Sequence, residues 1–228
     1  YARKPATDEF AAGLTRGDWR LGAGLEIDHH LRRAVPDENR VFFYRRTTVT
    51  ANVRRDPAEG SRQRLEYSYE FQRKGDIFNP DPTGVSIESR RRVHRVLAAV
   101  DAPLSAIDRL EVGHALLERS ARTGFPAAPT NSISYRRWES QPYARWRRRI
   151  NQSLLTDLGT FLSFGERRQN AAGNLGSSLF DSIIEAKLGA GLDFIFGPNG
   201  RIGIYSAFKL NDPSHPWGGG NIRALFLF

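Results

Sequence analysis

Arginine residues alternate with other residues in the most basic stretch of the chain, YARWRRRINQ at 143–152. If this stretch is a β-strand, Arg145, Arg147 and Arg149 lie on one face, because successive side chains of a strand point to opposite faces. Guanidinium groups bind carboxylates and phosphates through paired hydrogen bonds. The chemistry that this spacing favours is therefore binding of an anion, or pairing with acidic side chains of the chain itself.

Signals for catalysis and for metal binding are weak. The chain has no Cys, which excludes disulfides and thiolate metal sites. It contains no GxSxG, P-loop or HExxH motif, and its His residues lack the spacing of metal ligands. His30, Asp28 and Glu26 share one face of a strand, so a hydrolase remains an open alternative, although two adjacent His residues at a strand end are more typical of a solvated rim. We expect no catalytic residue, no metal and no cofactor.

Alternation of apolar and polar residues continues along most of the chain. In QRLEYSYEFQ (63–72), Leu65, Tyr67, Tyr69 and Phe71 lie opposite Arg64, Glu66, Ser68 and Glu70. Strands of ~9–11 residues, tilted by ~45°, are long enough to cross a bilayer. The pattern predicts about eleven strands, at 7–15, 18–31, 39–54, 62–74, 89–100, 107–121, 132–155, 158–167, 179–196, 201–211 and 220–228.

The breaks between these strands alternate in length. Short breaks such as RGD (16–18), TDLG (156–159) and GPNG (197–200) take turns with mostly longer ones. Short periplasmic turns and longer extracellular loops are typical of outer-membrane barrels. We predict an all-β fold, a transmembrane antiparallel up-and-down β-barrel that occupies residues 1–228. Since such barrels have even strand numbers, we expect 12 or more strands when complete, with one strand upstream of Tyr1 or partly within YARKP, and a longer protein of which this is the C-terminal part.

The last predicted strand has Ile222, Ala224, Phe226 and Phe228 at alternating positions and ends on an aromatic residue. Together with the strand pattern and the alternating lengths of the breaks, this last strand makes the chain resemble a Gram-negative outer-membrane β-barrel protein. The resemblance implies localisation in the outer membrane among lipids and lipopolysaccharide. It also implies that the barrel-assembly machinery reads Phe226 and Phe228 as an insertion signal.

Faces toward lipid and toward the lumen follow from the same alternation. Aromatic residues near strand ends, including Tyr143 and Trp146, are candidates for the interfacial girdles. RRRVHR (90–95) is either a strand extension above the membrane or an extracellular rim in contact with lipopolysaccharide phosphates. The basic residues expected to line the lumen and bind solute are Arg20, Arg64, Arg109, Arg145, Arg147, Arg149, Lys187, Arg201, Lys209 and Arg223. Their expected acidic partners are Glu26, Asp28, Glu66, Glu70, Glu111, Glu185 and Asp193.

Three functions fit a barrel with such a lumen. The first is a conduit, porin-like or for export of a polymer or solute, in which the basic residues favour anions. The second is a structural or assembly barrel that anchors an upstream periplasmic domain or a partner protein, its lumen braced by cross-strand ion pairs. The third is the hydrolase. The net charge of +9 also suggests nucleic-acid binding as a function. We exclude it because the sequence contains no recognition helix or zinc motif.

Overall fold

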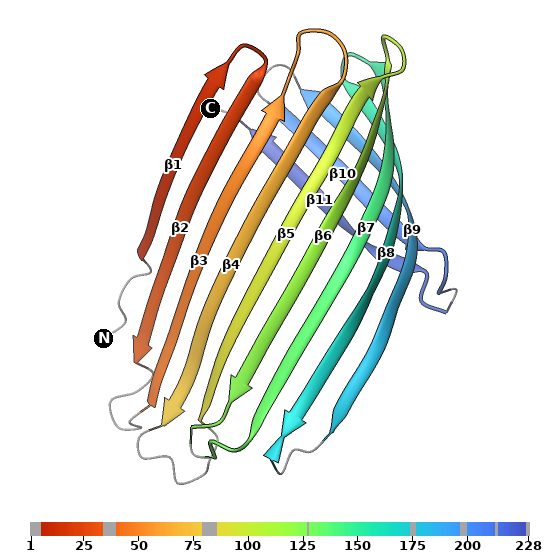
Figure 1. Ribbon diagram of the computed structural model, residues 1–228. Coiled ribbons are helices and arrows are strands. Elements are labelled where there is room, and N and C mark those ends of the chain that lie inside the picture. Colours follow the sequence, from red (N-terminus) through yellow and green to blue (C-terminus); the bar gives the residue numbers. More distant parts are fainter. Residues whose placement is uncertain are drawn as a thin grey trace.

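A single antiparallel sheet of eleven strands makes up the computed structural model, and each strand pairs with its neighbours in chain order. The sheet curls into an open trough (Figure 1). The structure describes residues 6–33, 40–78, 86–126, 128–173, 177–196, 200–212 and 214–226, with side chains except at 6, 29–33, 40, 78, 221 and 223–226. The strands are β1 (Ala6–Arg16), β2 (Trp19–Arg33), β3 (Arg40–Arg55), β4 (Arg62–Phe78), β5 (Ile87–Pro103), β6 (Asp108–Gly124), β7 (Ser132–Asn151), β8 (Leu154–Ala172), β9 (Ser178–Phe196), β10 (Gly200–Lys209) and β11 (Trp217–Phe226).

The predicted number and order of strands are confirmed, whereas several strand ends differ from the prediction and the turn between β7 and β8 is misplaced. The sequence predicted a strand over 132–155 and a turn at TDLG, but β7 ends at Asn151 and TDLG lies inside β8. The turn lies at 152–153, where the Asn151 side chain accepts a hydrogen bond of 2.8 Å from the Ser153 backbone N–H. Asn closes a turn locally in this way without Gly or Pro, so the turn carries little signal in the sequence.

Connections at the two ends of the sheet differ in length. Between β1–β2, β3–β4, β5–β6, β7–β8 and β9–β10 lie 17–18, 56–61, 104–107, 152–153 and 197–199, and this is called the short-turn end. At the other end, the long-loop end, lie 34–39, 79–86, 125–131, 173–177 and 210–216. The predicted alternation is confirmed except at 56–61, which is as long as 34–39. Gly17 has φ 55° in the two-residue turn, a conformation that Gly adopts without steric cost.

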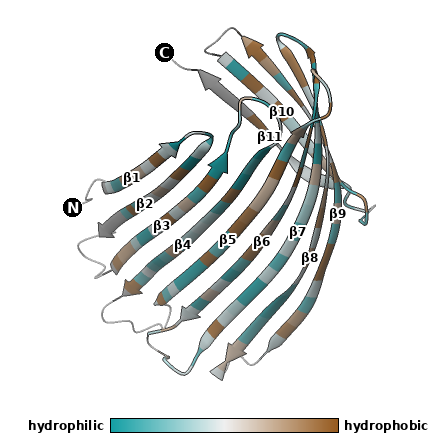
Figure 2. Ribbon diagram, turned by 45° about the horizontal axis from the view of Figure 1, so that its top comes forward, coloured by the Kyte–Doolittle hydropathy of each residue, from teal (hydrophilic) through white to brown (hydrophobic). Residues whose placement is uncertain are grey.

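Register separates the residues into two faces. Arg64 lies opposite Ala99, which lies opposite Gly113, and the same row continues through Tyr143, Phe161 and Lys187. These residues share the concave face of the trough. The residues of opposite parity form the outward face, and the alternation is visible in the hydropathy colouring (Figure 2).

Apolar side chains are distributed inside out compared with a water-soluble protein. The few buried apolar residues of the described chain, Leu97, Ala99, Ala115 and Ala207, lie on the concave face. Large apolar residues on the outward face are instead exposed, among them Leu21, Leu65, Val112, Leu158, Leu192 and Ile204. Continuous exposed apolar surface requires an apolar partner, and a band of lipid-facing residues supplies that need in a membrane barrel. No described helix is long and apolar enough to cross a membrane.

Candidate functional site

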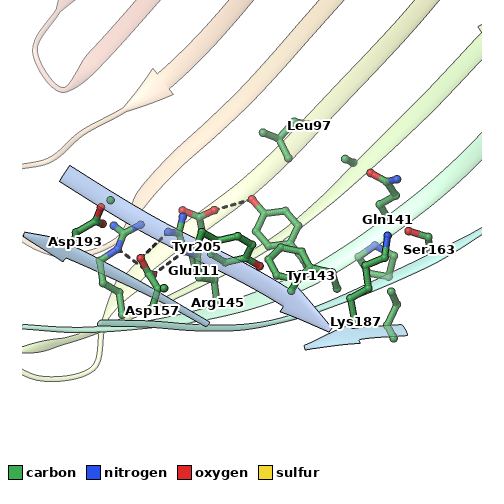
Figure 3. Close-up of a pocket in the computed structure, with 18 of the residues that line it drawn as sticks. Leu97, Glu111, Gln141, Tyr143, Arg145, Asp157, Ser163, Lys187, Asp193 and Tyr205 are labelled. Atoms are coloured by element: carbon green, nitrogen blue, oxygen red, sulfur yellow. Dashed lines mark hydrogen bonds and ion pairs between the residues drawn. The ribbon is translucent and has the colours of Figure 1, made fainter. Parts of the chain in front are cut away.

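A hollow of about 860 Å³ lies on the concave face and is lined by residues of β4 to β10. The curl of the sheet brings Arg201 and Tyr205 of β10 into the same hollow as Arg64 of β4 and Glu111 of β6. Figure 3 shows the polar side chains that point into it. Because lining residues come from strands far apart in the sequence, the hollow depends on the curvature of the whole sheet.

Tyr143 joins the acidic and basic side chains at one side of the hollow. Its hydroxyl donates to Glu111 Oε1 at 2.7 Å and accepts from Arg64 Nη2 at 3.2 Å, and Arg64 Nη2 also reaches Glu111 Oε1 at 2.8 Å. The tyrosine ring lies over Gly113 in the neighbouring strand, where a Cβ would come within 2.5 Å of it. It also stacks on Phe161 with ring centroids 5.9 Å apart. Glycine at position 113 is therefore what allows the ring to lie flat across the sheet.

Asp157 holds two arginine side chains at the floor of the hollow. Arg145 donates to it twice, at 2.7 Å from Nε and 2.6 Å from Nη2 (Figure 3), and Arg147 Nε donates at 3.4 Å. The Asp157 side chain is 4% exposed, whereas those of Arg145 and Arg147 are 31% and 28% exposed. The carboxylate is thus shielded behind the guanidinium groups, and these present their charge to the hollow.

In two further ion pairs the basic side chain is likewise more exposed than the acidic one. Arg64 is 36% exposed against 14% for Glu111, and Arg201 is 47% exposed against 15% for its partner Asp193. Lys187 and Glu185, 2.7 Å apart, are exposed about equally, at 28% and 33%. Four arginines of the hollow, Arg64, Arg145, Arg147 and Arg201, are therefore more exposed than the carboxylates that they bind.

Seven of the residues predicted for the lumen line the hollow: Arg64, Arg145, Arg147, Lys187, Arg201, Glu111 and Asp193. Other predicted residues lie elsewhere on the concave face and are paired there. Arg109 pairs with Asp101 at 2.9 Å, Glu66 with Arg54 at 3.0 Å, and Lys209 with Asp212 at 3.7 Å.

At the β1 side of the sheet, Glu26 and Asp28 both bind Arg46, each at 2.6 Å. Arg20, Glu70 and Arg149 also have concave-face parity, and none of the three forms an ion pair with another described residue. The side chains of Arg223, Phe226 and His30 and the whole of Phe228 lie outside the described residues, so the insertion signal stays a prediction.

Sequence reasoning missed several residues of the site. Tyr143 was predicted for an interfacial girdle, which is wrong, since the ring points into the hollow. Asp157 was placed in the predicted turn TDLG, although it lies in β8 opposite Arg147. Tyr205 and Phe161 were not singled out. Tyr143 and Arg145 are two residues apart on one strand, so their shared parity indicates that Tyr143 faces the lumen. The pairing of Asp157 with Arg145 could be predicted only with the correct boundary between β7 and β8.

Chemistry other than binding has little support among the described side chains. No group of three or more His, Asp or Glu residues there could hold a metal ion. His114 Nε2 lies 2.8 Å from Ser140 Oγ, but on the outward face and with no carboxylate hydrogen-bonded to the ring among the described residues. The arrangement satisfies two polar groups in an apolar band.

Comparison with known proteins identifies the fold. No family model matches the chain, and no curated protein matches it in sequence. Solved structures of outer-membrane β-barrels do match it in three dimensions. The chain therefore has the fold of an outer-membrane β-barrel, with its sheet open over the described strands. The predicted resemblance and all-β fold are confirmed, and the outward apolar band agrees with the predicted localisation in the outer membrane.

Among the matching structures are receptors for import. The alcaligin outer-membrane receptor FauA of Bordetella pertussis aligns with a TM-score of 0.70 and 14% identity, over 96% of this chain and 39% of that one. The ferric-catecholate import receptor Fiu of E. coli K12 aligns with 0.63 and 10% over 90% and 46%. The ferric citrate transporter FecA aligns with 0.62 and 11% over 89% and 36%. The chain thus spans less than half the length of these structures.

Proposed function

We propose that the chain forms part of an outer-membrane import barrel whose concave face binds an anionic solute. Ferric chelates of anionic oxygen ligands are the leading class, because two of the similar structures are named for ferric catecholate and ferric citrate. The sequence predicted a conduit, and the proposal specifies that this conduit imports its solute and binds it on the way. An upstream domain, a periplasmic partner and the assembly machinery remain proposed partners of the same barrel.

One observation carries this proposal. Arg64, Arg145, Arg147 and Arg201 are each more exposed to the hollow than the carboxylate that they bind. A solute entering the hollow meets guanidinium groups first, and a guanidinium has five N–H donors, of which a single carboxylate uses at most two. The remaining donors suit the oxygen atoms of an anion.

Binding of ferric citrate by the purified protein that contains this chain, followed by tryptophan fluorescence, tests the proposal. We expect ferric citrate to bind and the neutral sugar sucrose not to bind. The variant Arg145→Gln with Arg147→Gln weakens binding at least tenfold, about 1.4 kcal/mol. A control with two arginines replaced on the outward face, Arg16→Gln with Arg55→Gln, keeps the wild-type affinity. Equal affinity of both variants, or equal binding of citrate complex and sugar, contradicts the proposal.

A structural barrel is the second candidate, and the extent of ion pairing favours it. Pairs such as Arg109–Asp101 and Arg54–Glu66 link neighbouring strands across the concave face, and such pairs brace a sheet. Planar-bilayer recordings separate the candidates. Open channels would support the passive conduit that the sequence predicted, whereas a folded barrel with neither conductance nor solute binding would support the anchor.

A further inference from the structure

Four arginines lie side by side on the outward face, on four adjacent strands. Arg45 of β3 is opposite Arg73 of β4, Arg73 is opposite Arg90 of β5, and Arg90 is opposite Arg122 of β6. We call these four residues the arginine row. All four are exposed. Like charges directly opposite each other in a sheet are destabilising, so the row requires a compensating anion.

Carboxylates of the chain supply only part of the negative charge that the row requires. Glu88 Oε1 accepts from Arg73 Nε at 2.9 Å and from Arg90 Nε at 3.1 Å. Arg45 and Arg122 form no ion pair within the described part of the chain. Nearby carboxylates are already used, since Glu118 binds Arg136 at 2.9 Å and Glu166 binds Arg168 at 3.1 Å. Four positive charges thus share one negative charge.

A pair of opposed arginines on the concave face gives a contrast. Arg54 lies opposite Arg64 there, but each has a carboxylate, Glu66 at 3.0 Å and Glu111 at 2.8 Å. In this concave pair the protein supplies one carboxylate for each arginine, whereas the four arginines of the outward row share only Glu88. The remaining counter-charge of the row must therefore come from outside the protein.

On β4 the arginine row begins where the apolar band ends. Counted from the short-turn end, the outward residues of β4 are Leu65, Tyr67, Tyr69 and Phe71, followed by Arg73. Tyr67 and Tyr69 contact His94 of β5, with the Tyr67 hydroxyl 3.2 Å from His94 Nδ1 and the Tyr69 ring centroid 4.7 Å from that of His94. Aromatic residues with polar groups of this kind mark the interface of a membrane barrel. The row therefore lies at headgroup level on the long-loop side.

The short-turn end has no such row on its outward face. Arg55 lies over the Trp19 ring at 5.9 Å. Arg148 lies over the Trp146 ring at 5.9 Å and is 3.8 Å from Asp108. The outward arginines at that level, Arg16, Arg55 and Arg148, do not lie opposite one another. Among the described outward residues, a row of four opposed arginines therefore occurs only on the side of the long loops.

We propose that the arginine row binds the phosphate groups of lipopolysaccharide in the leaflet next to the long loops. Guanidinium pairs with phosphate through parallel hydrogen bonds. Strands lie about 4.8 Å apart, so the row extends over about 14 Å, enough for two phosphate groups on one headgroup. A zwitterionic phospholipid carries its own cation beside a single phosphate and neutralises the row poorly. This inference depends on the barrel fold and not on the solute proposed above.

Native mass spectrometry of the purified protein in detergent tests the inference, with diphosphoryl lipid A, monophosphoryl lipid A and phosphatidylethanolamine as probes. We expect diphosphoryl lipid A to bind at least tenfold more tightly than the other two. The variant Arg45→Gln with Arg90→Gln and Arg122→Gln loses at least tenfold of that affinity. A matched control at the short-turn end, Arg16→Gln with Arg55→Gln and Arg148→Gln, stays within twofold of the wild type.

Two outcomes would overturn the assignment. Equal affinity of the row variant and the control variant means that the arginine row does not bind the lipid. Full displacement of lipid A by millimolar inorganic phosphate means that the row binds free phosphate instead. If the triple variant does not show the heat-modifiable migration of a folded barrel, the double variant Arg45→Gln with Arg122→Gln takes its place, since both residues are exposed. At least a threefold loss of affinity is then expected, and no loss refutes the proposal.

Discussion

Asp157 is the least exposed of the carboxylates that line the hollow. It accepts two hydrogen bonds from Arg145 and one from Arg147 and is almost fully shielded. Replacing Asp157 with Asn leaves two guanidinium groups without their carboxylate. We expect Asp157→Asn to lower the free energy of unfolding by about 2–4 kcal/mol, measured by urea titration in detergent micelles. Affinity for ferric citrate rises in the same variant, because the two arginines are freed for the solute.

The control for this change is Asp181→Asn. Asp181 binds Arg167 at 2.7 Å, but both side chains are well exposed, at 49% and 39%. Exposed ion pairs contribute roughly 0–1 kcal/mol, so this variant unfolds at nearly the same urea concentration as the wild type. Equal destabilisation by both changes would show that shielding does not set the strength of these pairs.

Gly113 permits the geometry of Tyr143. A Cβ at position 113 would lie 2.5 Å from Tyr143 Cε1, Cζ and Oη, well inside contact distance. Gly113→Ala therefore forces the ring away and breaks its bond to Glu111, at a cost of about 1–3 kcal/mol typical of overpacking. Gly124→Ala is the matched control, because nothing lies within 4 Å of its added Cβ. Chemical denaturation of the two variants side by side measures the difference, and equal midpoints would contradict the role assigned to Gly113.

At the scale of elements, the sequence was sufficient to predict which face of a strand each residue occupies. It was not sufficient to predict which residues of neighbouring strands pair. The alternation that separates Leu65 from Arg64 is a local property of one strand, so facing could be predicted wherever the pattern was regular. The pairing of Arg145 with Asp157 depends instead on register between β7 and β8. A misplaced turn at 156–159 removed Asp157 from the strand altogether. Register follows from turn position and length, and the Asn151 turn is hard to recognise from sequence.

Depth within the apolar band gives a prediction for β9. Leu188 lies in the middle of its outward apolar residues and is 43% exposed. In water an exposed Leu→Arg change is nearly neutral, whereas Arg on a lipid-facing strand costs roughly 2–4 kcal/mol at the midplane. We expect Leu188→Arg to destabilise the barrel by this amount in lipid vesicles, measured by urea unfolding.

Ser182→Arg is the control for depth. Ser182 is exposed on the same face of β9, nearer the long-loop end, and lies opposite Glu166. An arginine there meets a carboxylate at interface level, where the cost falls to ~0–1 kcal/mol. Similar losses for the two variants would argue that the outward face of β9 does not contact the membrane interior.

For the whole molecule, the two edges of the sheet set the conditions for folding. The described sheet runs from β1 to β11, and one edge of each of these strands has no partner within it. Ten antiparallel pairings separate the two strands, so β1 and β11 run in the same direction. A barrel of antiparallel pairs therefore cannot form by joining these edges directly. In lipid every backbone N–H and C=O needs a partner, so we expect further strands to cover both edges.

We predict that the 228-residue chain alone does not fold in detergent and that added strands covering both edges allow it to fold. The measurement is heat-modifiable gel migration together with trypsin resistance, with and without those strands. The reason is the cost of unpaired backbone groups at two open edges, which the ion pairs of the concave face cannot offset because they lie between strands already paired. A heat-modifiable monomer formed from the 228 residues alone would show that β1 and β11 pair in parallel.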